Sequence, residues 1–187
     1  NAGRNLISLP DTIVVLNAQN DTLRIRNAVY DTCGRLIQLK QYANDSVSQY
    51  NFSHDQYGNT DSIIYPRNYY GQRMFYCYQY DTCIYTFPVK TTDAFGYNSS
   101  AEYDYLCGKP ILSIDMNGAK MEYQYDSWGR LTQLTGPYEH GNLDAYTIRM
   151  NYKPHRTGAP ATPLHSIAAT LHYDIQHPDN PIITTVI

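Results

Sequence analysis

Residues 115–131 read DMNGAKMEYQYDSWGRL, and this stretch decides the fold. Each of its two predicted turns begins with an aspartate and has a glycine three residues later: Asp115 with Gly118, and Asp126 with Gly129. Aspartate at the first position of a tight turn accepts hydrogen bonds from the backbone ahead of it, and the glycine takes the positive φ that returns the chain as a hairpin. We therefore predict a hairpin turn at each pair.

The same spacing recurs along the whole chain. It occurs five times, whereas the numbers of aspartate and glycine residues give about one such pair by chance. A repeat of this kind indicates a string of hairpins. The turn residues that we predict are Asp31 with Gly34, Asp55 with Gly58, Asp93 with Gly96, Asp115 with Gly118, and Asp126 with Gly129.

Tyrosine completes the repeating unit. Between the two turns of the first stretch, Met121, Tyr123 and Tyr125 alternate with polar residues, and a period of two predicts a strand with one aromatic face. The tetrapeptide YQYD occurs at both 78–81 and 123–126. Cross-strand packing explains aromatic residues at this period better than a ligand-stacking platform does. The aromatic residues that we predict to be structural are Tyr30, Tyr78, Tyr80, Tyr123, Tyr125 and Trp128.

The fold class follows from the spacing of strands and turns. No long stretch keeps an apolar stripe at helical spacing, and Gly, Pro, Asn and Asp interrupt the chain too often for long helices. We predict an all-β fold in which antiparallel hairpins form one curved, open sheet. Further strands are expected near residues 23–30, 35–39, 47–53, 62–65, 74–80, 146–150, 167–173 and 181–187.

The quality of the repeat changes along the chain. We treat residues 1–187 as a single sheet fragment cut from a longer protein, with the best repeats over 23–136. Prolines interrupt the shorter strands over 137–187, which form a looser connection and terminal strands. Within that region, residues 153–163 offer few apolar side chains, and we expect an exposed connection there.

Composition argues against several functional classes. The net charge is −3 without a run of like charges, which disfavours nucleic-acid binding, and no apolar run is long enough for a transmembrane helix. The three glutamates are far apart, at least five aspartates belong to turns, and no nucleophile motif or phosphate loop is present. We therefore expect neither an enzyme nor a bound cofactor or metal.

The four cysteines, Cys33, Cys77, Cys83 and Cys107, lack the spacing of a zinc site. Free thiols are the favoured interpretation, and a disulfide between Cys77 and Cys83 across a turn is the alternative. Cys33 occupies the turn position that Trp128 has in its sibling repeat. We expect Cys33 to be semi-buried and Trp128 to act as a structural plug in its turn.

Two copies of one heptapeptide pattern carry a family resemblance. Residues 30–36 and 125–131 both read Tyr-Asp-x-x-Gly-Arg-Leu, which resembles the Tyr-Asp (YD) repeat of the Rhs family. Residues 103–110, running into 115–118, look like the version found in shell-forming components of bacterial insecticidal toxin complexes. The turn at Asp81 departs from the pattern because it lacks the glycine, so we expect a wider hairpin there. The family's self-cleaving aspartate site has no recognisable counterpart, and no catalytic residue is carried over.

The resemblance implies a function and a set of partners. It implies a bacterial, secreted or cell-surface structural protein whose β-shell encloses a toxic cargo domain and helps to deliver it. The partners would be the remainder of the same shell and the enclosed toxin domain. An adhesive or carbohydrate-binding β module remains the alternative. Because an excised sheet has uncovered strand edges, we also expect the isolated chain to self-associate through them.

Overall fold

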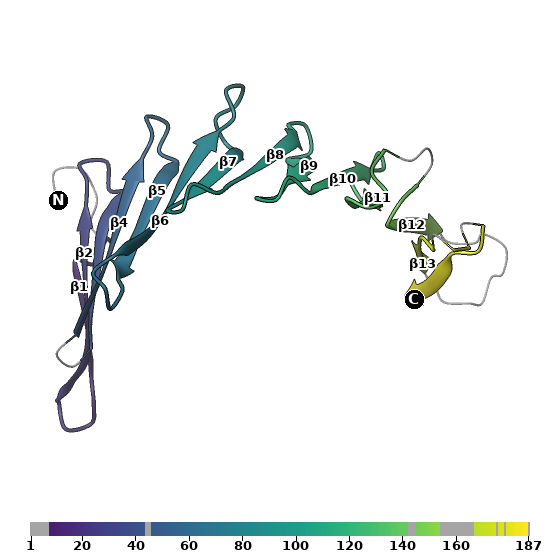
Figure 1. The fold of residues 1–187 in the computed structure, drawn as a ribbon. Coiled ribbons are helices and arrows are strands. Elements are labelled where there is room, and N and C mark those ends of the chain that lie inside the picture. Colours follow the sequence, from purple (N-terminus) through teal and green to yellow (C-terminus); the bar gives the residue numbers. More distant parts are fainter. Residues whose placement is uncertain are drawn as a thin grey trace. The chain divides into compact units, whose positions relative to one another are not determined.

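The structure is a computed structural model that describes residues 8–43, 46–141, 145–153, 167–174, 176–177 and 179–186. The chain divides into two units, residues 1–98 and residues 99–187. The described residues contain fourteen strands and no helix (Figure 1), which confirms the predicted all-β fold.

Seven strands make up the sheet of the first unit, and each pairs antiparallel with the next along the chain. They are β1 (Thr12–Leu16), β2 (Thr22–Tyr30), β3 (Leu36–Ala43), β4 (Ser46–His54), β5 (Thr60–Arg67), β6 (Arg73–Tyr80) and β7 (Pro88–Asp93).

The second unit follows the same plan, with antiparallel pairing between successive strands. Its strands are β8 (Asn98–Asp104), β9 (Lys109–Ile114), β10 (Lys120–Tyr125), β11 (Leu131–Thr135), β12 (Ile148–Lys153), β13 (Ile167–His172) and β14 (Ile182–Val186). In neither unit do the described residues pair the first strand with the last, so both sheets are open.

The structure places all five predicted Asp–Gly pairs at hairpin turns. In each turn the glycine N–H donates to the aspartate carbonyl, and the aspartate N–H donates to the carbonyl of the residue after the glycine. The five glycines have φ between +72° and +96°. This is a three-residue hairpin loop, in which a type I turn is followed by a residue in the left-handed conformation. Glycine adopts that conformation without strain.

Six hairpins carry a bulge at the same place. Tyr30 pairs with Leu36 whereas Val29 pairs with Gln38, so Ile37 is an extra residue on the returning strand. A bulge of this kind bends the strand and increases its local twist. The same shift occurs next to the turns that begin at Asn17, Asp55, Asp81, Asp104 and Asp126.

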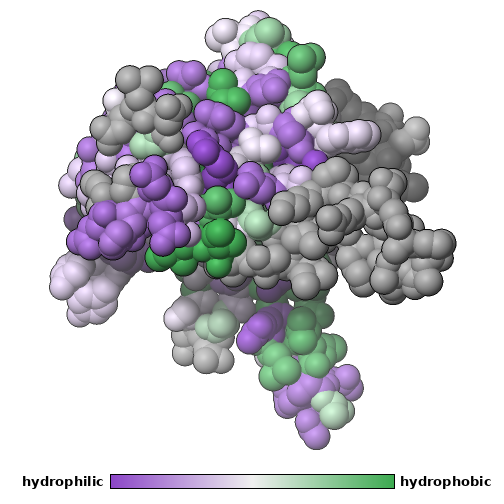
Figure 2. All heavy atoms as spheres, turned by 90° about the vertical axis from the view of Figure 1, so that its right-hand side faces the viewer, coloured by the Kyte–Doolittle hydropathy of each residue, from purple (hydrophilic) through white to green (hydrophobic). Residues whose placement is uncertain are grey.

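The sheets have almost no buried core. Among the described residues, Ala145 and Tyr146 are the only buried hydrophobic residues, and each is 7% exposed. In β6 the residues of both faces are half-buried except for Gln79. On the face that Figure 2 shows, hydrophobic residues lie in separate groups among hydrophilic ones. Cohesion must therefore come from contacts within the sheet layer.

Several strands differ from the predicted ranges. The sequence did not single out β1, β7, β8 or β9, because their residues alternate poorly between apolar and polar. The strand predicted at 146–150 is β12, which begins at Ile148, and the preceding residues form the buried end of a loop. Most of the exposed connection predicted over 153–163 lies outside the described residues.

Candidate functional site

The carboxylate of each turn aspartate holds its turn together. In the turn that begins at Asp126, Oδ1 accepts hydrogen bonds from the backbone N–H groups of Trp128 and Arg130, at 3.0 and 2.8 Å. The other predicted turns repeat this pattern, with Oδ1 bonded to the N–H groups two and four residues ahead. In the first turn, Oδ2 of Asp31 also accepts from Nε of Arg35 at 2.6 Å. The aspartate thus orders the loop through bonds that lie within five residues.

Asparagine does the same at two turns that the sequence analysis missed. Oδ1 of Asn68 accepts from the N–H groups of Tyr70 and Gln72, and Gly71 has a φ of +79°. Asn17 starts a similar turn between β1 and β2, where Asn20 takes the glycine position with a φ of +63°. Because asparagine tolerates the left-handed region and its carbonyl oxygen accepts as aspartate does, a search for Asx-x-x-Gly or Asx-x-x-Asn would find both turns.

Asp81 begins the wider turn that the sequence predicted. Its backbone N–H donates to the carbonyl of Phe87, two residues further on than in the shorter turns. Asp81 is 2% exposed, and its carboxylate accepts hydrogen bonds from five backbone N–H groups, which belong to residues 83–87. Burial alone raises the pKa of this carboxyl group, but the five donors outweigh burial and the pKa lies well below its ordinary value of 3.8.

Tyrosines that precede a turn aspartate tie one hairpin to the previous one. The hydroxyl of Tyr80 donates to the carbonyl of Thr60 at 2.9 Å, and that of Tyr125 donates to the carbonyl of Pro110 at 2.8 Å. Tyr30 reaches the carbonyl of Pro10 in the same way at 3.2 Å. Burial raises the pKa of the Tyr80 and Tyr125 phenols, so both remain protonated donors at neutral pH.

At three turns the residue that follows the turn glycine reaches forward to a later turn. Nη1 of Arg35 donates to the carbonyl of Asp55 at 3.1 Å, and Nδ2 of Asn59 donates to the carbonyl of Tyr85 at 2.6 Å. In the second unit, Nζ of Lys109 donates to the carbonyl of Gly129. We call these forward bonds, together with the tyrosine bonds to the previous hairpin, turn lacing. Turn lacing joins hairpins within one layer and needs no second layer of structure.

The remaining predicted aromatic residues lie on the sheet faces. Tyr78 and Tyr123 are half-buried, and the Tyr123 hydroxyl lies 3.2 Å from Oγ of Ser113 on β9. Across β4, β5 and β6, Tyr65 makes edge-to-face contacts with Tyr50 and Tyr76, at centroid distances of 5.6 and 6.0 Å. Offset and edge-to-face pairs of this kind stabilise neighbouring strands directly.

Two expectations about turn residues were wrong. Trp128 is 84% exposed and does not plug its turn, and Cys33 is exposed rather than semi-buried. Both stand at the third position of a type I turn, where the side chain projects away from the sheet. All four cysteines are free, so the alternative disulfide between Cys77 and Cys83 is absent.

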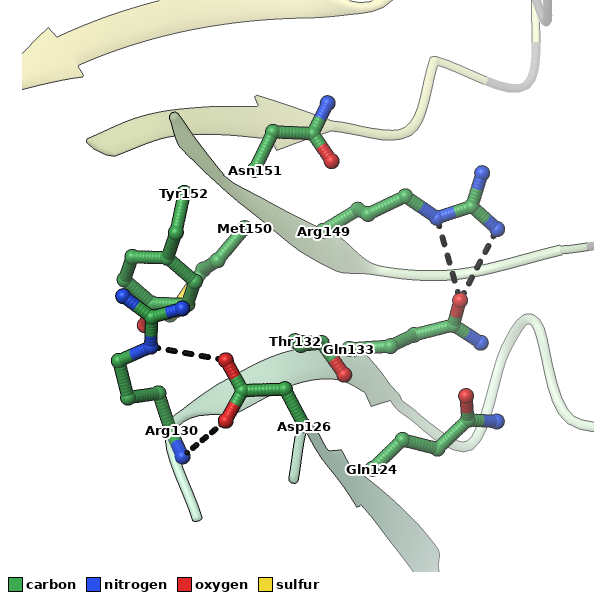
Figure 3. A pocket seen from close by; sticks show the side chains of 9 residues that line it. All are labelled: Gln124, Asp126, Arg130, Thr132, Gln133, Arg149, Met150, Asn151 and Tyr152. Atoms are coloured by element: carbon green, nitrogen blue, oxygen red, sulfur yellow. Dashed lines mark hydrogen bonds and ion pairs between the residues drawn. The ribbon is translucent and has the colours of Figure 1, made fainter. Parts of the chain in front are cut away.

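A groove on the second unit lies across β10, β11 and β12 (Figure 3). Its volume is about 590 Å³, and its lining combines polar side chains, such as Asp126, Arg130, Gln133 and Arg149, with Met150 and Tyr152. Nε and Nη2 of Arg149 lie 3.2 and 2.9 Å from Oε1 of Gln133, and Nε of Arg130 lies 2.8 Å from Oδ2 of Asp126. None of these residues except Asp126 belongs to the predicted site set, since the groove depends on pairing between distant segments.

The residues that the structure describes contain no cluster of three or more His, Cys, Asp or Glu side chains that could hold a metal ion. None of their segments is a helix of the length and hydrophobicity needed to cross a bilayer.

Comparisons with known proteins show similarity of fold only. No family model matches the chain, and no curated protein matches its sequence. Among solved structures, a crystal structure of TcdB2-TccC3-Cdc42 is similar to this chain, with a TM-score of 0.52 and 15% identity. The match covers 94% of this chain and 9% of the matched chain. The chain therefore shares the fold of a short part of that toxin-complex assembly.

Two further structures match less well. The Photorhabdus luminescens Tc holotoxin pore with a TccC3 mutation has a TM-score of 0.39 and 10% identity, over 88% of this chain and 13% of the matched one. A crystal structure of TcdB2-TccC3-TEV has a TM-score of 0.27 and 12% identity, and the match covers 96% of this chain and 15% of the matched one.

Turn lacing predicts a measurable role for the tyrosine hydroxyl. Tyr125→Phe removes the hydroxyl and leaves the carbonyl of Pro110 without this donor, so the free energy of unfolding should fall by about 1 kcal/mol. Tyr138→Phe is the matched control, because Tyr138 is 90% exposed. Urea unfolding followed by circular dichroism measures both changes. Equal free energies of unfolding of the two variants would contradict a stabilising role for the Tyr125 hydroxyl.

The lowered pKa of Asp81 predicts how the free energy of unfolding depends on pH. Its folded-state pKa is lower than its unfolded value, so its contribution is fully present above about pH 4 and is lost as the pH falls toward the folded-state pKa. Asp81→Asn should lower the free energy of unfolding at pH 7 and weaken its decrease between about pH 4 and pH 2. Asp11→Asn, at an exposed position, is the control. Urea unfolding over a pH series measures both, and an unchanged pH slope in Asp81→Asn would contradict the prediction.

Proposed function

We propose that this chain is a wall segment of a larger bacterial β-shell, which encloses a toxic cargo domain and helps to deliver it. The observation that supports the proposal is that hydrogen bonds between hairpins of the same sheet hold it together, without a second layer of structure. Asp and Asn carboxylates and amides fix the turns, tyrosine hydroxyls bond to the previous hairpin, and Arg35 and Lys109 bond to the next turn. Such a layer can separate two compartments without a hydrophobic core on either side.

One solved structure supports the same role. The crystal structure of TcdB2-TccC3-Cdc42 shares the fold of this chain, and this chain corresponds to 9% of the matched chain. A sheet this small within a much larger chain agrees with a repeated wall element rather than a complete protein. The remainder of the shell and an enclosed toxin domain are the proposed partners, and a secreted or cell-surface location is proposed with them.

We further propose that the role is structural rather than catalytic. The turn aspartates use their carboxylate oxygens for backbone N–H groups, and the pKa values of Asp31 and Asp115 are lowered chiefly by the backbone N–H four residues ahead. A carboxylate held in this way is a poor general acid or base near neutral pH. The groove side chains described above are likewise engaged with one another.

Containment can be tested on the product of the complete reading frame that encodes this chain. If the chain is part of a closed wall, a protease should cleave the cargo domain at least about tenfold more slowly within the full protein than as an isolated domain. Paired substitutions Asp31→Ala and Asp55→Ala remove two turn carboxylates and should speed cleavage. Time courses of cargo cleavage by gel electrophoresis measure both rates.

The Tyr138→Phe protein serves as the control in that experiment, and its cargo should be protected as in the wild type. Cleavage of the cargo in the wild-type protein at the rate of the isolated domain would contradict enclosure. Absence of further Tyr-Asp repeats on either side of this chain would also contradict it.

Self-association of the isolated chain should take place at β1. The carbonyl of Asp11 accepts from the N–H of Ala28, and antiparallel pairing alternates, so the backbone groups of Thr12 and Val14 point away from β2. The strand has no charged residue, and its apolar side chains are about half exposed. An open apolar edge of this kind pairs readily with another strand.

A charge on that edge should prevent the association. Val14→Lys should give a monomer at concentrations where the wild-type chain forms dimers or larger species, as measured by sedimentation velocity. Val29→Lys is the matched control, because Val29 is 46% exposed against 48% for Val14 but lies on β2, which is paired on both sides. A monomeric wild-type chain, or equal effects of the two substitutions, would contradict edge pairing.

A further inference from the structure

Two tyrosines from successive hairpins of the first unit stack face to face. The rings of Tyr57 and Tyr85 are nearly parallel, with an interplanar angle of 17° and a centroid distance of 3.9 Å. Tyr57 belongs to the turn between β4 and β5, and Tyr85 belongs to the turn between β6 and β7. These two turns lie at the same end of the sheet (Figure 1). The ring pair therefore bridges two hairpins.

Hydrogen bonds fix the backbone around the pair. Nδ2 of Asn59 donates to the carbonyl of Tyr85 at 2.6 Å and to Oδ2 of Asp55 at 3.0 Å, which ties the two turns together. The N–H groups of Tyr57 and Tyr85 each donate to the carboxylate that begins their own turn. Tyr85 has a φ of +55°, a left-handed conformation that is strained for a residue with a large side chain. The turns thus set the positions of both rings.

The two phenols point the same way and are open to solvent. A hydrogen bond with the Tyr57 hydroxyl raises the pKa of Tyr85, so the two hydroxyls adjoin. In parallel rings with adjoining hydroxyls, the carbons next to each hydroxyl lie over their counterparts in the other ring. These are the carbons at which two tyrosyl radicals join. Tyr57 is 52% exposed and Tyr85 is 37% exposed, so an oxidant can reach both.

Other tyrosine pairs in the same unit are arranged differently. Tyr65 meets Tyr50 and Tyr76 edge to face, at interplanar angles of 66° and 79°. The rings of Tyr69 and Tyr70 meet at 85°, although these residues are 97% and 82% exposed. In an edge-to-face pair the reactive carbons of the two rings do not lie over one another. Experiment can therefore separate the effect of stacking from that of exposure.

We propose that Tyr57 and Tyr85 form an oxidative cross-linking site, at which a peroxidase and hydrogen peroxide join the two rings as dityrosine. Each phenol loses one electron and one proton and becomes a tyrosyl radical. The radicals form a carbon–carbon bond between the carbons next to their hydroxyls, and each of these carbons then passes its proton to the neighbouring oxygen. Hydrogen peroxide accepts the two electrons and the two protons, its O–O bond breaks, and two molecules of water form.

The cross-link adds a covalent tie to turn lacing. Because the rings are already in position, their radicals couple without a diffusional encounter, which favours this pair over others. A covalent link between the two turns also restricts the unfolded chain, as a disulfide does. The four cysteines are free and supply no such link. The proposal does not rest on the shell role.

The test treats the full chain, at low protein concentration, with a haem peroxidase and hydrogen peroxide. The thiols are alkylated first so that they do not reduce the radicals. We expect dityrosine fluorescence in monomeric protein and, after trypsin digestion, a product in which peptides 41–67 and 74–90 are joined with the loss of two hydrogen atoms. Tyr57→Phe and Tyr85→Phe should each lower its yield at least about tenfold, since phenylalanine keeps the ring but forms no phenoxyl radical. The cross-linked protein should unfold at a higher urea concentration.

The control is Tyr70→Phe, because Tyr70 is more exposed than either proposed residue but its ring pair is edge to face. This substitution should leave the yield unchanged, and circular dichroism should show the same sheet in all variants. The proposal is overturned by an unchanged yield in Tyr57→Phe, by dityrosine formed mainly at Tyr69 or Tyr70, or by products that link only separate chains. None of these results bears on cargo enclosure.

Discussion

The hydrogen bonds from backbone N–H groups to a turn carboxylate are the constraint on which the rest of the structure depends. Each one lies within a few residues of sequence, so a hairpin can form without help from distant segments. In the turn that begins at Asp81, five such donors surround one buried carboxylate, and Tyr85 takes the left-handed conformation with a φ of +55°. Because the turns are self-sufficient, the sheet tolerates having almost no buried core.

Turn lacing adds order between hairpins. A tyrosine before the turn bonds backward, as Tyr80 does to Thr60, and a polar residue after the glycine bonds forward, as Asn59 does to Tyr85. The repeated bulge places an extra residue in the returning strand beside each of these turns. Tyrosine suits this position because its ring packs against neighbouring strands while its hydroxyl satisfies a carbonyl at the strand end. Tyr30, Tyr80 and Tyr125 thus share one structural role.

Much of the fold could be predicted from the sequence, because the information is local. Asp-x-x-Gly determines a turn through bonds inside the turn, and alternation determines a strand. The turns at Asn17 and Asn68 were missed only because the pattern was restricted to aspartate. Trp128 and Cys33 were placed wrongly, since local pattern does not say which side of a turn faces the sheet. The groove could not be predicted, because Arg149 meets Gln133 only through the register of β11 and β12.

The short reach of the lacing has a mechanical consequence. Each tie spans one hairpin and no further, as in the step from Arg35 to Asp55 or from Lys109 to Gly129. A pulling force applied to the ends of such a chain meets a series of small, nearly equal barriers rather than one large one. The polypeptide should therefore peel apart one hairpin after another at similar loads, and the hairpins still in place should keep their structure while their neighbours are drawn out.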